Sequence, residues 1–221
     1  MEPNWAADNL QVIRTLMERS ALYRRAMAPI MLSTGGIGVA GAVTGISMSS
    51  PYGKVFVGYW VLICLVAVVV AFVIARRQAV KESEPFWTPP TRRVAMAFAA
   101  PFLAAAALTA VLVFAGWENG VLDVASSTVT LVAIWLVFYG CGLNSAGFFI
   151  SRGVKILGWL FIICGILLSM VVAAGIRSDP LFLLRWNSLS NPHLVMGATF
   201  GGLHLASGIY LYFTEKRKNA A

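Results

Sequence analysis

The sequence predicts an all-α, polytopic transmembrane helix bundle with six spans, both termini in the cytoplasm and an amphipathic helix at the amino terminus. Two features of composition support this fold class. Of the 221 residues, 59% are hydrophobic and only 12% are charged, whereas soluble domains contain about 25% charged residues. The mean hydropathy is +0.79. A third observation is that uncharged apolar runs recur along the chain, each long enough to cross a hydrocarbon core roughly 30 Å thick.

The amino-terminal segment, residues 1–26, is predicted to form an interfacial helix. A capping-box pattern begins at Asp8. Leu10, Ile13 and Met17 follow at helical spacing and form an apolar stripe. We expect this helix to lie on the cytoplasmic surface of the membrane or to dock onto a protein partner.

The six spans fall within residues 27–214, and none of them contains Asp, Glu, Lys or Arg. They are predicted at residues 27–48, 55–75, 94–116, 124–150, 156–175 and 193–213. All three cysteines lie inside spans, without the spacing of a disulfide framework or a zinc site. Residues 215–221 form a short basic tail. The segments between spans are too short to fold as a soluble catalytic domain.

The basic residues predict the orientation, because cytoplasmic loops carry an excess of Lys and Arg. Fourteen of the 17 Lys and Arg residues fall on one side of the six-span topology: Arg14, Arg19, Arg24, Arg25, Arg76, Arg77, Lys81, Arg92, Arg93, Arg152, Lys155, Lys216, Arg217 and Lys218. Only Lys54, Arg177 and Arg185 fall on the other. Both termini are therefore predicted to be cytoplasmic. The net charge of +8 is explained by these flanks, so we expect no direct contact with nucleic acid.

Groups that could support catalysis are sparse. The chain contains no phosphate-binding glycine loop, no Cys/His cluster, no paired carboxylates and no Ser/His/Asp set. An enzyme in the membrane needs a nucleophile, a base and a way to stabilise charge, and the spans offer only hydroxyl groups and two histidines. We therefore expect a protein that is not an enzyme and that has neither a metal site nor a cofactor.

Both histidines lie in the last span, on a stripe of small residues. His193 and His204 are eleven residues apart, which places them about 20° apart around an α-helix and roughly 16 Å apart along it. Gly197, Gly201 and Gly208 fall on the same stripe. Small residues at this spacing allow another helix to approach closely, so the stripe and both histidines are predicted to face protein.

The role predicted for His204 is packing, as a neutral side chain hydrogen-bonded to a neighbouring helix. The fourth span supplies two candidate partners, Tyr139 at a similar depth and Asn144 nearer the cytoplasm. An ionisable group inside a membrane is also a functional candidate, so His204 as a haem or quinone contact stays open. Another alternative is a channel or facilitator for a small neutral solute, with a pore near spans one, four and six.

The two ends of the chain resemble a family of uncharacterised small bacterial inner membrane proteins with six spans. The amino-terminal motif is IR-x-x-MER, here Ile13, Arg14, Met17, Glu18 and Arg19. The closing motif is FGGLH followed by a glycine, here Phe200, Gly201, Gly202, Leu203, His204 and Gly208. The resemblance implies a bacterial inner membrane location and no established activity. It also implies genes that neighbour small winged-helix transcriptional regulators.

The leading functional hypothesis is a non-catalytic binding, sensing or regulatory membrane component. Its partners would be the lipid bilayer and a cytoplasmic protein, for which the resemblance suggests a winged-helix regulator. An oligomer is left open, because small-residue stripes also serve contacts between copies.

Overall fold

A computed structural model describes residues 27–48, 52–81, 83, 86–115, 121–178 and 191–219 of the chain. The predicted amphipathic helix at residues 1–26 lies outside these residues. All regular elements within them are helical, and six helices are long and apolar enough to cross a membrane: Met27–Ile46, Gly53–Lys81, Thr91–Phe114, Ser127–Gly147, Arg152–Gly175 and Pro192–Thr214. Each coincides with one predicted span, so the all-α, multi-pass membrane fold is confirmed. The side on which the termini lie remains a prediction.

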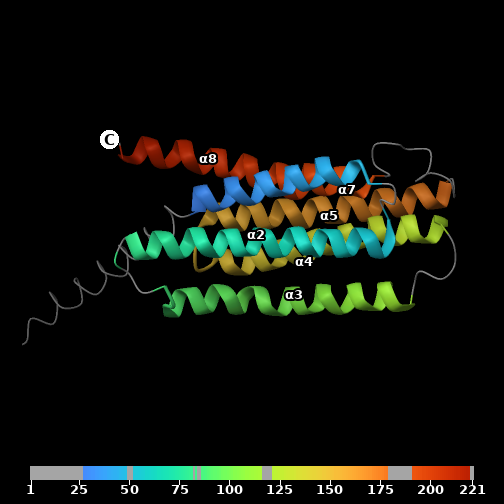
Figure 1. Cartoon of the computed structure of the whole chain (residues 1–221), viewed down its shortest axis with the longest axis horizontal. Helices are drawn as coiled ribbons and strands as arrows, with labels where there is room; N and C mark the ends of the chain where they lie inside the picture. Colours follow the sequence, from blue (N-terminus) through green and yellow to red (C-terminus); the bar gives the residue numbers. More distant parts are fainter. Residues whose placement is uncertain are drawn as a thin grey trace, which may run out of the picture.

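The helices run side by side and alternate in direction (Figure 1). The first helix, Met27–Ile46, precedes α2 (Gly53–Lys81), α3 (Pro89–Ala115), α4 (Val121–Gly147) and α5 (Arg152–Ser178). The last span is composite: α7 (Pro192–Met196), a π-helical segment (Gly197–Gly201) and α8 (Gly202–Asn219). We call the end of the bundle where α2 ends and α3 begins the basic end, because Arg76, Arg77, Arg92, Arg93, Arg152 and Lys155 lie there.

Glycines set the contact between the first helix and the last span. A Cβ on Gly38 would come within 2.9 Å of Gly201 Cα. A Cβ on Gly208 would lie 2.8 Å from the backbone nitrogen of Leu32. Side chains larger than hydrogen would therefore force the two backbones apart. The predicted small-residue stripe of the last span faces the first helix.

A second glycine contact joins α4 and α5. A Cβ on Gly140 would lie 2.6 Å from the carbonyl oxygen of Gly158, and a Cβ on Gly165 would lie 2.8 Å from that of Ala133. At α2, Gly53 has a φ of 71°, which favours glycine. Its N–H donates to Thr128 Oγ1 of α4 at 3.0 Å, which satisfies one unpaired donor at the start of α2.

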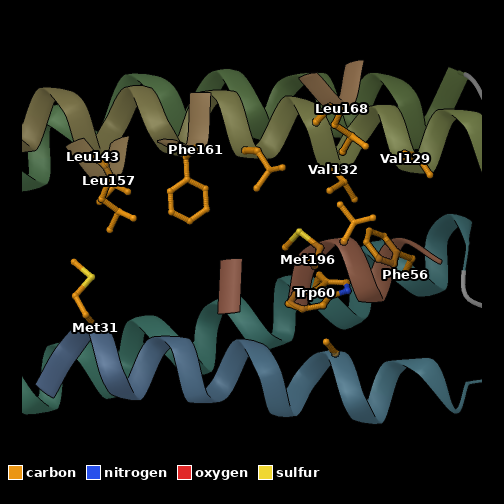
Figure 2. Close-up of a cluster of buried hydrophobic side chains, with 14 of the residues drawn as sticks. Met31, Phe56, Trp60, Val129, Val132, Leu143, Leu157, Phe161, Leu168 and Met196 are labelled. Atoms are coloured by element: carbon orange, nitrogen blue, oxygen red, sulfur yellow. The ribbon is translucent and has the colours of Figure 1, made fainter. Parts of the chain in front are cut away.

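Apolar side chains fill the interior and also cover much of the outside, as expected for a protein surrounded by lipid. Figure 2 shows part of the interior, where Phe56 and Trp60 of α2 lie near Met196 and Val132, while Phe161 points inward from α5. Leu62 and Leu103 are examples of large apolar side chains on the outside. The most apolar window of α3 contains no buried residue. This helix packs on α4 but not closely on α2, and Figure 1 draws it at the edge of the bundle.

Candidate functional site

His193 lies at the start of the last span and is fully buried. Asn191 caps this helix, because its Oδ1 accepts from the His193 backbone N–H at 3.0 Å. Trp60 Nε1 donates to His193 Nδ1 at 3.1 Å. Since Nδ1 accepts, the proton of the neutral ring is on Nε2, and this buried nitrogen has no partner among the described residues. His193 therefore holds the indole of Trp60 in place.

The second histidine, His204, is also buried, and both of its ring nitrogens are engaged. Nδ1 lies 2.7 Å from the carbonyl oxygen of Phe200. A carbonyl can only accept, so Nδ1 carries a proton. Nε2 lies 2.8 Å from Tyr139 Oη. No Asp or Glu lies in the apolar runs that form the spans, so the ring is assigned as neutral, and Nε2 accepts the hydroxyl proton of Tyr139.

The prediction that both histidines and the three glycines share one straight stripe is wrong in detail. That prediction assumed α-helical geometry throughout, but the chain is π-helical from Gly197 to Gly201, where Gly202 N–H donates to the carbonyl of Gly197. The wider turn changes which side chains face which neighbour. The glycines and His193 lie against the first helix, whereas the His204 ring lies against Tyr139 of α4 and Phe161 of α5.

The structure brings together only some of the residues singled out from the sequence. Tyr139 and His204 are hydrogen-bonded to each other. Gly197 lies against Ala42 of the first helix. Asn144 packs against Gly158 of α5, and its buried Nδ2 has no partner among the residues described. Asn144 is thus part of the α4–α5 contact.

A large cavity of about 1190 Å³ lies between α2 and α3. Its inner wall is formed by α4, α8 and the first helix, through residues that include Trp135, Tyr139, His204 and Met31. Near the basic end, the rings of Phe72 in α2 and Phe86 before α3 are 4.9 Å apart. We call this cavity the α2–α3 groove. It exceeds the roughly 300–1,000 Å³ of common ligand pockets.

The α2–α3 groove follows the depth of the membrane. The α2 residues in its wall extend from Trp60 to Ala79, which at 1.5 Å per residue is about 28 Å, close to the roughly 30 Å of a hydrocarbon core. Most of the side chains in the wall are apolar. The polar ones are few: Thr34, Gln78, Thr88, Thr91, Arg93, Thr109, Tyr139 and His204.

Two polar groups in the middle of this wall bind to each other. Trp135 Nε1 donates to Thr109 Oγ1 at 2.9 Å, and Thr109 Oγ1 donates to the Ala105 carbonyl at 2.7 Å. Thr109 Oγ1 keeps one lone pair after these two bonds, whereas Tyr139 Oη, which donates its hydrogen to His204, keeps two lone pairs that can accept. The Tyr139–His204 pair is therefore a polar feature in the middle of the groove that a ligand could use.

Both ring nitrogens of His204 already have hydrogen-bond partners, and this affects whether His204 can bind a haem iron. An iron bound at Nε2 would have to displace the Tyr139 hydroxyl, and one at Nδ1 would have to displace the Phe200 carbonyl. No group of three or more His, Cys, Asp or Glu side chains suited to a metal occurs in the described ranges. His204 therefore does not offer an open axial ligand.

The α2–α3 groove is the feature that sequence reasoning missed. One signal was available: residues 89–115 contain no glycine, and span two contains none after Gly58, whereas the closely packed helices have glycines at their contacts. Comparisons with protein-family models, curated proteins and solved structures found no match.

Proposed function

We propose that this chain is a non-catalytic bacterial inner membrane protein that binds a long apolar molecule from the lipid phase in the α2–α3 groove. In this proposal, a cytoplasmic protein partner binds at the basic end of the bundle. Its binding depends on whether the groove holds a ligand. The resemblance of the two termini to bacterial membrane proteins supports the location and suggests a regulator as the partner.

The observation that carries the proposal is the shape of the α2–α3 groove together with its lining. A groove about as long as the hydrocarbon core suits an extended acyl or isoprenoid chain. A chain bound in the groove would fill the void. The apolar side chains of the wall would then gain van der Waals contacts that they otherwise lack. A channel for a small neutral solute would need a wetted path with polar groups along it, and the apolar wall supports that alternative less well.

The test uses quenching of tryptophan fluorescence by brominated acyl chains. Trp135 lines the groove, whereas Trp159 is on α5, is 57% exposed and does not line it. Two variants are prepared in detergent, each keeping one of these as its only tryptophan, and both are titrated with phosphatidylcholine that has dibrominated acyl chains. We expect saturable quenching of Trp135 and a gradual, non-saturating decrease for Trp159.

A matched pair of substitutions on α3 tests the location. Ala105 lines the groove, and Ala107, two residues further on, is exposed and does not. Ala105→Phe should fill part of the groove and weaken the saturable quenching, while Ala107→Phe should leave it unchanged. Quenching curves of the same shape for Trp135 and Trp159 would contradict the proposal.

A further inference from the structure

The α2–α3 groove contains an acceptor whose orientation is fixed from within the protein. Phe200 holds the proton of His204 on Nδ1, so Nε2 can only accept. Tyr139 therefore donates its hydroxyl hydrogen to Nε2 at 2.8 Å. The hydrogen of Tyr139 cannot at the same time be offered to a ligand.

Tyr139 Oη is consequently an acceptor on a residue that lines the α2–α3 groove. The ring of Tyr139 is held on several sides, with Phe161 at 5.0 Å and Phe200 at 5.4 Å between ring centroids. Aromatic packing of this kind limits how far the hydroxyl group can move. A ligand group that meets this oxygen gains a hydrogen bond only if it has a proton to donate.

We propose that the ligand in the α2–α3 groove is a long-chain alcohol whose hydroxyl group donates a hydrogen bond to Tyr139 Oη, an inference that rests on the proposed function. A ketone, an ester or a quinone carbonyl only accepts, and it would face an oxygen that has no proton available. An ammonium or guanidinium head group would donate too, but it would carry a charge into an apolar groove. Of these head groups, the hydroxyl group is the neutral donor that suits both the site and its surroundings.

His204 is a positioning residue in this arrangement. It does not meet the ligand through a free nitrogen; it fixes the direction of the Tyr139 hydroxyl. The selectivity for a donor therefore depends on a chain of three groups, from the Phe200 carbonyl through the His204 ring to the Tyr139 oxygen.

The test compares three probes with the same chain: 1-hexadecanol, its methyl ether and hexadecane. Each is used to reverse the quenching of Trp135 by the brominated lipid. The alcohol can donate, the ether can only accept, and the alkane can do neither. Since one neutral hydrogen bond is involved, we expect the alcohol to compete about three- to tenfold better than the ether.

Tyr139→Phe keeps the ring and removes the oxygen, so alcohol and ether should then compete equally while both still reverse the quenching. Tyr59→Phe is the control, because the Tyr59 hydroxyl donates to the Gly41 carbonyl at 2.6 Å and Tyr59 does not line the groove. This control should keep the preference for the alcohol.

The first comparison uses the protein that keeps Trp135 as its only tryptophan, with Tyr139 and His204 unchanged, and the two tyrosine variants are made in that same protein. Equal competition by alcohol and ether in that protein would overturn the inference and leave the proposed function standing. A lack of saturable quenching of Trp135 by the brominated lipid would instead overturn the proposed function. Persistence of the alcohol preference in Tyr139→Phe would place the donor contact elsewhere and also overturn the inference.

Discussion

Replacing Gly201 by Leu is expected to destabilise the bundle more than any change at His204 that keeps a polar group. A Cβ at Gly201 would come within 2.8 Å of the backbone nitrogen of Val39, whereas ordinary contacts of a Cβ begin at 3.4 Å. To reach ordinary contact, the first helix would therefore have to move by about 0.6 Å for the Cβ alone. A backbone cannot turn aside as a flexible side chain can, so the remaining atoms of Leu add to this displacement.

The magnitude follows from overpacking. Extra carbon atoms in a well-packed contact cost typically about 1–3 kcal/mol and sometimes more, and for Leu at this position we expect about 3 kcal/mol. His204→Gln keeps an amide that can bond either Phe200 or Tyr139 but loses one of two hydrogen bonds, which costs about 1 kcal/mol. For a chain of this size each kcal/mol corresponds to roughly 2–4 °C in the melting temperature.

The assay is thermal unfolding in detergent, followed by circular dichroism, for wild type, Gly201→Leu and His204→Gln. Gly202→Ala is the matched control on the adjacent residue, since the nearest atom to a Cβ there is 3.8 Å away. We expect Gly201→Leu to melt several degrees below His204→Gln, and Gly202→Ala to melt at or above the wild-type temperature. A Gly201→Leu protein as stable as His204→Gln would refute the reasoning from close backbone contact.

Two further predictions concern topology and the amino-terminal segment. The distribution of basic residues predicts that reporter fusions at Asp123 and Asn219 will lie on opposite sides of the membrane, and the same side for both would contradict the six-span topology. Replacing Leu10, Ile13 and Met17 together by Ser should weaken association with vesicles or with a co-expressed partner and leave the melting temperature of the spans unchanged. A large loss of thermal stability in that triple variant would show that the segment belongs to the folded core.

The number and type of the helices were predictable from the sequence, because whether a segment can cross a membrane depends on the composition of that segment alone. A span needs about 20 apolar residues, and that requirement is met or not met within each segment separately. The same local logic predicted that Gly197, Gly201 and Gly208 would allow a close helix contact. It could not predict that the first helix makes this contact, because partner choice depends on the whole bundle.

The sequence predicted Tyr139 and Asn144 as candidate partners of His204. Only the tertiary structure decided that Tyr139, 65 residues away along the chain, makes the hydrogen bond. This hydrogen bond depends on the relative depth and rotation of α4 and α8. The rotation in turn depends on the π-helical turn at Gly197–Gly201, which no α-helical periodicity reveals. The α2–α3 groove is equally non-local, because it exists only where two apolar helices do not pack on each other. Composition determined that this chain has six helices suited to crossing a membrane, and long-range packing determined where a cavity is left between them.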